Sequence, residues 1–96
     1  MEEIKLSKKT AQGSVIPLNG VTLVFAKTDA GFVGCGLFDI PVFERFNCPA
    51  AKVRSQKGPI TDIEGLLSAP VIEVNDSAKK LGINEGISGK EALEKL

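Results

Sequence analysis

Two short apolar runs separated by a polar link place the strongest constraint on the fold of this chain. The first run, residues 21–26, is β-branched and aromatic with almost no polar break, which is typical of a strand buried on both faces. The second run, residues 32–38, is similar but is interrupted by glycines. The link, residues 28–31, ends in Gly31 and suits a type I turn closed by a residue at positive φ. The pattern therefore predicts a β-hairpin at the centre of a sheet.

The charge balance limits the classes of partner. The chain has 96 residues, enough for one modest core, so we expect a single domain over residues 1–96. Its 12 basic and 12 acidic residues cancel, which gives no electrostatic reason to expect nucleic acid or an anionic membrane as a partner. Zero net charge also leaves little repulsion between copies of the chain, and we expect a homo-oligomer.

Several absences restrict the chemistry and the location. No apolar run approaches the ~18 residues of a membrane span, and residues 1–15 do not resemble a secretory signal. Cys35 and Cys48 are therefore expected to be reduced thiols in the cytoplasm, and two soft ligands are too few for a closed zinc site. The chain has no histidine, which excludes a Cys–His dyad and a Ser–His–Asp triad within one chain. We expect no metal and no cofactor.

The first 20 residues are typical of further antiparallel strands. Residues 3–6 alternate and predict a short strand, and residues 10–18 predict a longer one. Gly13 suggests a bulge in that second strand, and Pro17 suggests its end or an edge position. The pair Asn19-Gly20 is a strong two-residue hairpin signal and leads directly into the first apolar run.

Beyond residue 38 the spacing of apolar residues becomes helical. Pro41 suits the first turn of a helix, where its missing N–H costs nothing. The apolar face of this helix would be formed by Val42, Phe43 and Phe46.

The rest of the chain alternates strand and helix signals. Residues 50–55 and 71–74 predict two more strands. Asp76 suits the cap of one brief helix, and two capping boxes predict two others: Thr61 with Glu64, and Ser88 with Glu91. The predicted order is ββββαβαβαα. It indicates an α+β fold, a mainly antiparallel sheet with three to four short helices packed on one face.

Three segments of this chain resemble the YunC-like family (domain of unknown function 1805). They are residues 31–40, residues 66–70 and the closing residues 81–93. The resemblance covers most of the chain and implies a small prokaryotic, often archaeal, α+β domain. It implies no activity, because none is established for the family. Residues 46–49 depart from the glycine-containing connection of the family, so Cys48 is not carried over as a functional residue.

Cys35 is the only candidate for catalysis. It lies between Gly34 and Gly36, close to the start of the helix predicted near Pro41. Glycine on both sides leaves the backbone accessible, and a helix N-terminus favours the nucleophilic thiolate. The alternative is a small buried hydrophobic residue whose glycine neighbours admit another element. The missing histidine favours this alternative.

Three charged residues could complete a ligand site. Asp39 could orient a ligand, although Pro41 two residues later favours a helix-capping role. Lys52 and Arg54 share one face of a predicted strand and could attract an anion, or could simply be solvated. Glycine-rich backbone at a strand-to-helix junction can also hold an anion through N–H groups. The predicted ligand residues are Gly34, Cys35, Gly36, Asp39 and Arg54.

Three function classes follow from these patterns. The favoured one is an oligomeric binding or regulatory module with a ligand site near residues 34–39 that could accept a small anion. A small thiol-dependent enzyme using Cys35 is the second. A structural or assembly protein without a small-molecule site is the third.

Overall fold

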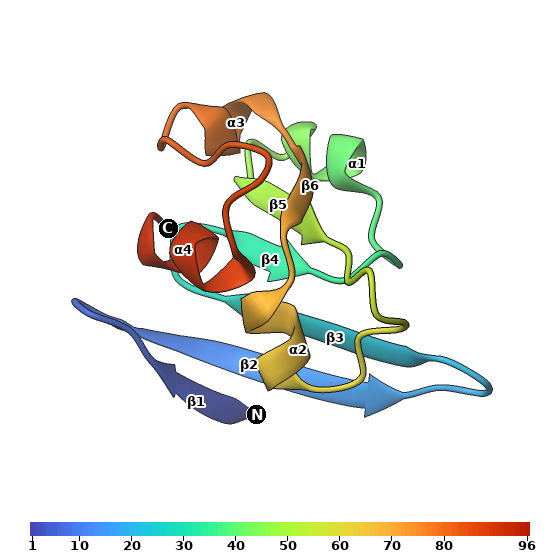
Figure 1. The fold of residues 1–96 in the computed structure, drawn as a ribbon. Helices are drawn as coiled ribbons and strands as arrows, with labels where there is room; N and C mark the ends of the chain where they lie inside the picture. Colours follow the sequence, from blue (N-terminus) through green and yellow to red (C-terminus); the bar gives the residue numbers. More distant parts are fainter.

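The structure, a computed structural model that describes residues 1–96, contains six strands and four short helices in the predicted order (Figure 1). The strands are β1 (Glu2–Lys5), β2 (Thr10–Pro17), β3 (Thr22–Lys27), β4 (Phe32–Gly34), β5 (Ala50–Val53) and β6 (Val71–Val74). The helices are α1 (Ile40–Glu44), α2 (Ile63–Ser68), α3 (Asp76–Lys79) and α4 (Gly89–Glu94). The α+β class is confirmed.

The six strands form one sheet in sequence order, β1-β2-β3-β4-β5-β6. All neighbouring pairs are antiparallel except β4 and β5, which are parallel. A parallel pair needs a crossover connection, and α1 lies in it. The β3–β4 hairpin therefore occupies the centre of the sheet, as predicted.

Two details of the central hairpin differ from the prediction. Strand β4 ends at Gly34 instead of continuing to residue 38. The N–H of Cys35 still donates to the carbonyl of Val24 (3.0 Å), but the chain then turns, and the N–H of Phe38 donates to the carbonyl of Cys35 (3.4 Å). Gly31 does not have a positive φ. It is glycine because an added Cβ would collide with the carbonyl oxygen of Pro49.

Gly13 does not form the predicted bulge. It is in regular register with Glu2 on one side and Ala26 on the other. A Cβ at Gly13 would lie 2.6 Å from Cδ1 of Ile63, so this glycine makes room for α2 on the sheet. Pro17 does end β2, as predicted.

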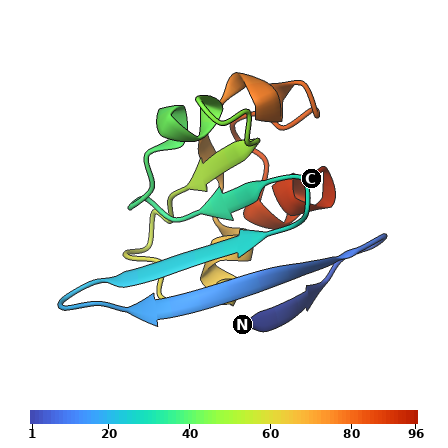
Figure 2. The ribbon, with the colours of Figure 1, turned by 180° about the vertical axis from the view of Figure 1, so that it is seen from behind.

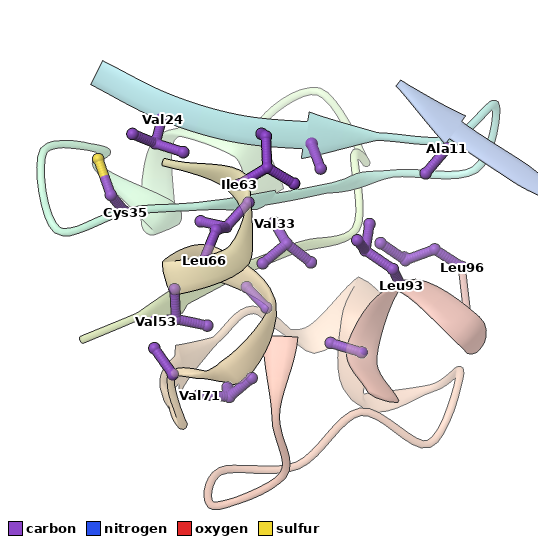
Figure 3. Packing of buried hydrophobic residues seen from close by; sticks show 14 of the residues in the cluster. Ala11, Val24, Val33, Cys35, Val53, Ile63, Leu66, Val71, Leu93 and Leu96 are labelled. Carbon is purple, nitrogen blue, oxygen red and sulfur yellow. The ribbon is translucent and has the colours of Figure 1, made fainter. Parts of the chain in front are cut away.

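Helices cover both faces of the sheet, and the predicted placement on one face is wrong. Helices α2 and α4 pack on the face that we call the α2/α4 face, over the buried strand residues Val24 and Val33, and Leu93 of α4 belongs to the same cluster (Figure 3). Helix α1 packs on the opposite face, the α1 face, over Phe32 and Ala50 (Figure 2). Strand alternation requires this division, because neighbouring residues such as Phe32 and Val33 point to opposite faces.

Helix α1 is also shorter than its apolar spacing predicts. It ends at Glu44, and Asn47 adopts a positive φ of 55° shortly afterwards. Of the predicted apolar face, Phe43 is half-buried against the α1-face cluster, whereas Val42 is 40% exposed and Phe46 is 76% exposed.

The helix caps explain where the later helices begin. The capping box of Ser88 and Glu91 is present, with both reciprocal hydrogen bonds. The cap of α2 is Asp62 instead of Thr61, and its carboxylate accepts from the N–H of Gly65 at 2.8 Å. The cap of α3 is Asn75 instead of Asp76, and its amide oxygen accepts from the N–H of Ala78 at 3.0 Å.

The outer edge of β6 is occupied by the chain itself. The N–H of Val71 donates to the carbonyl of Ile87 (2.7 Å), and the N–H of Gly86 donates to the carbonyl of Val71 (2.9 Å). Pro70 and Ser88 form an isolated bridge beside these bonds. The segment before α4 therefore satisfies the outward N–H and carbonyl of Val71 and lies along this edge.

Candidate functional site

A cavity of about 330 Å³ opens where three strands of the sheet end or begin. Because β4 and β5 are parallel, their carboxyl ends lie at one edge of the sheet, where antiparallel β3 begins. The loops at these three ends form the walls. The lining residues are Gly20, Val21, Thr22, Cys35, Gly36, Leu37, Val53, Arg54, Ser55, Gly58, Pro59, Ile60 and Thr61.

The cavity has a buried apolar inner wall and an exposed mouth. Cys35, Val53 and Ile60 are the buried lining residues, with 4%, 0% and 9% of their surface exposed. At the mouth Val21 is 49% exposed and Leu37 is 52% exposed. An enclosed apolar wall with a few polar groups at its rim is the usual composition of a small-molecule site.

Three of the five predicted ligand residues line this cavity: Cys35, Gly36 and Arg54. Gly34 and Asp39 do not. A Cβ at Gly34 would lie 2.5 Å from Cδ2 of Phe38, so Gly34 makes room for aromatic rings on the α1 face. Asp39 is the exposed N-cap residue of α1, although its side chain makes no capping hydrogen bond.

Cys35 lies at the edge of the α2/α4-face cluster, beside Val24 (Figure 3). Apart from Cys35, the only lining residue with an ionisable side chain is Arg54, whose guanidinium has five N–H donors and no acceptor atom. The cavity therefore offers no carboxylate, imidazole or amine to activate the thiol.

Lys52 and Arg54 are separated by an irregularity in β5. Lys52 is opposite Glu73 in the sheet, and its Nζ lies 3.3 Å from Oε1 of Glu73. The register then shifts between Lys52 and Val53, and β5 ends. Arg54 consequently lies beyond the strand, with its N–H donating to the carbonyl of Pro70 (3.1 Å) and its side chain in no ion pair. Only Arg54 of this pair belongs to the cavity.

Sequence reasoning missed the walls formed by residues 20–22 and 58–61. Gly20 was interpreted only as part of a hairpin turn, residues 21–22 only as the start of a strand, and Thr61 only as a helix cap. One signal was available, because nine residues, 54–62, connect β5 to α2. Connections of this length in a compact domain are longer than the usual few residues and often carry a binding function.

No helix is long and apolar enough to cross a membrane. No group of three or more Cys, Asp or Glu side chains is arranged to hold a metal ion.

Comparisons with known proteins identify relatives of the whole fold. The chain is 32% identical over 87 residues to the uncharacterized protein YunC of Bacillus subtilis (strain 168), covering 83% of this chain and 86% of that protein. It superimposes with a TM-score of 0.88 on the crystal structure of TA1206, a protein of unknown function from Thermoplasma acidophilum. That match has 26% sequence identity and covers 99% of this chain and 89% of the other.

The family match includes most of the cavity. The model of the domain of unknown function DUF1805 matches residues 34–96, which contain Cys35, Arg54 and the loop at residues 58–61. The wall at residues 20–22 lies outside the matched range but inside the structural superposition, which covers nearly the whole chain. The predicted resemblance is thus confirmed, and the chain belongs to the DUF1805 family of YunC-like proteins.

Proposed function

We propose that this protein is a binding module that holds a small ligand in the cavity between the loops after β4 and β5. The observation that carries the proposal is the cavity itself. Its volume of about 330 Å³ lies at the lower end of the range for small-molecule sites, roughly 300–1,000 Å³. It also lies where several strand ends meet, and loops on a rigid sheet are common carriers of binding residues.

The chemistry of the cavity wall favours binding over thiol catalysis. A nucleophilic cysteine needs a partner that keeps it as thiolate, and no base lines this cavity. Cys35 is also buried, with only 4% of its surface exposed. Cys35 acts here as part of the apolar wall.

The test is to fill the cavity without disturbing the fold. A Cβ added at Gly36 meets no atom within 4 Å, so Gly36→Phe places a ring in open space beside the cavity. The probes are hexanol, hexylamine and hexanoate, followed by backbone amide shifts in NMR titrations. We expect at least one probe to shift the amides of Val53 and Thr61 saturably in the native protein, and not in Gly36→Phe.

The matched control is Leu18→Phe. Leu18 is 51% exposed in the β2–β3 turn, beside the cavity wall at residues 20–22, but does not line the cavity, so probe binding should persist. Saturable shifts that survive in Gly36→Phe, or their absence with all three probes in the native protein, would overturn the proposed function.

We also propose a second role, assembly of identical copies through the uncovered part of the α1 face. The exposed Ile16, with the half-buried side chains of Leu23 and Phe25 at its border, forms what we call the open patch. Ile16 is opposite Leu23 in the β2–β3 register, and no helix covers this part of the face (Figure 2). Ile16 is 42% exposed. Residues 10–26 carry no charge at all, which leaves this surface without the charges that normally discourage association.

A second copy of the chain is the partner that the surrounding charges favour. Strand alternation places Glu3, Lys5 and Lys27 on the same face as the open patch, because Ile4 and Ala26 belong to the opposite core. The rim of the open patch therefore carries both negative and positive charges. A two-fold related copy can set an acidic rim residue against a basic one, as an isologous interface requires.

A further inference from the structure

We infer that the ligand of the cavity carries a single negative charge, a carboxylate, on an apolar body, with Arg54 as its anchor. This inference rests on the proposed binding function and adds the chemical class of the ligand. Among the thirteen lining residues Arg54 is the only one with a permanent charge, and no acidic residue lines the cavity. The electrostatic preference of the site is thus for an anion.

The guanidinium of Arg54 is free to bind a ligand. It forms no ion pair and no side-chain hydrogen bond within the protein, whereas the neighbouring cation Lys52 is paired with Glu73. Arginine presents a planar fork of donors that matches the two oxygens of a carboxylate. Arg54 is exposed, so the charged end of the ligand would remain at the mouth, where desolvation costs least.

The inner wall determines the rest of the ligand. Cys35, Val53 and Ile60 are buried and present apolar surface, so this part of the cavity suits an aliphatic or aromatic body. Thr22 and Thr61 also line the cavity and carry hydroxyl groups; Thr22 is half-buried and Thr61 is exposed. They can bind a neutral polar group but add no positive charge, so one cation is available and a dianion is disfavoured.

The experiment compares hexanoate with hexanol, which shares the six-carbon body but lacks the charge. Binding is followed by amide shifts in the native protein, in Arg54→Gln and in the control Lys57→Gln. Lys57 is an exposed cation on the same loop that does not line the cavity. In the native protein and the control we expect hexanoate to bind about tenfold more tightly than hexanol, a difference of about 1.4 kcal/mol. In Arg54→Gln the two probes should bind equally.

The outcomes separate this inference from the proposed function. Hexanol binding as tightly as hexanoate in the native protein would overturn the carboxylate inference and leave the binding function standing. A hexanoate preference that survives in Arg54→Gln would overturn the role of Arg54. If no probe binds, both the function and the inference fail. Thermal melts of each variant verify that the fold is intact, as expected for substitutions at exposed positions.

Discussion

The two faces of the sheet differ in how completely they are buried. On the α2/α4 face, eighteen buried residues form one continuous cluster, whereas on the α1 face only Phe32, Ile40 and Ala50 are buried in the second cluster. Two helices cover the first face, while α1, a helix of five residues, covers only part of the second. The comparison indicates that stability is concentrated on one face, which leaves the other available for contacts.

The two faces also pack with different chemistry. The α2/α4 face is aliphatic, with small residues such as Ala11 and Gly13 that let the helices approach. The α1 face is aromatic. The rings of Phe32 and Phe38 lie 4.6 Å apart edge to face, and those of Phe32 and Phe43 are stacked at 4.7 Å. Large rings fill the space that one short helix leaves beside the sheet.

The largest effect is expected from Leu66→Ala on the α2/α4 face. Leu66 is fully buried in the eighteen-residue cluster, so the substitution leaves a cavity in the main core. We expect it to lower the free energy of unfolding by roughly 2–5 kcal/mol, measured by urea denaturation. A loss below about 1 kcal/mol would contradict the view that this face dominates stability.

Phe32→Leu tests the covered part of the α1 face. Phe32 is 8% exposed, and its ring contacts three other phenylalanine rings. We expect a loss of roughly 1–2 kcal/mol in the same assay, because aromatic contacts are lost while most of the volume is kept. Phe46→Leu is the control. Phe46 is 76% exposed, so this substitution should change the free energy of unfolding little. A larger loss for Phe32→Leu than for Leu66→Ala would reverse the ranking of the two faces.

The attachment of α1 to α3 should depend on pH. The N–H and hydroxyl of Ser77 both donate to the carboxylate of Glu44 at 2.9 Å. The backbone N–H of Ser77, followed by its hydroxyl, lowers the pKa of Glu44 below its ordinary value of 4.5. The pKa of Glu44 is therefore lower in the folded than in the unfolded state. The stability that these hydrogen bonds contribute is complete above pH 4.5 and is lost as the pH falls through the folded-state pKa.

Glu44→Gln should therefore destabilise the protein slightly at neutral pH and progressively less in acid. Thermal melts across this range measure the difference between the native protein and the variant. Glu85→Gln, at an exposed carboxylate without a hydrogen-bond partner, is the matched control and should show no such trend. A difference that stays constant down to strong acid would rule out Glu44 as the titrating group.

The smallest effect on stability is expected from Ile16→Ser in the open patch. Ile16 is 42% exposed, so the unfolding free energy of the monomer should change by no more than about 0.5 kcal/mol. Sedimentation of the same variant tests assembly, since removal of this side chain should shift an oligomer towards monomer. Leu81→Ser, at an exposed leucine far from the patch in sequence, should leave assembly unchanged. A native protein that is monomeric at high concentration would refute the second proposed role.

Local signals in the sequence were sufficient to predict the order of all ten elements. Asn19-Gly20 and the capping box of Ser88 and Glu91 are satisfied by hydrogen bonds between near neighbours, so the local pattern determines them. The roles of Gly13 and Gly31 were predicted wrongly. Both glycines are required by contacts with residues at least 18 positions away, Ile63 and Pro49, which a local pattern does not contain.

The candidate site was predictable only in part for the same reason. Cys35, Gly36 and Arg54 stand out by their type and neighbours, and the parallel pairing of β4 with β5 brings them to one cavity. Gly34 also stands out, but its place is explained by the ring of Phe38 on the other face. The wall at residues 58–61 follows from the path of a loop, which no residue pattern specifies.

The segment that lies along β6 has a consequence for aggregation. On one side of the sheet, β1 is the edge strand and has no strand beyond it, but three of its four residues are charged. On the other side, residues 86–88 already occupy the edge of β6. A strand of a neighbouring molecule thus meets charged side chains at one edge and the chain's own segment at the other, and both oppose extension of the sheet into a fibre. The proposed assembly of identical copies is accordingly expected to use side chains on a face of the sheet and not the backbone of its edges.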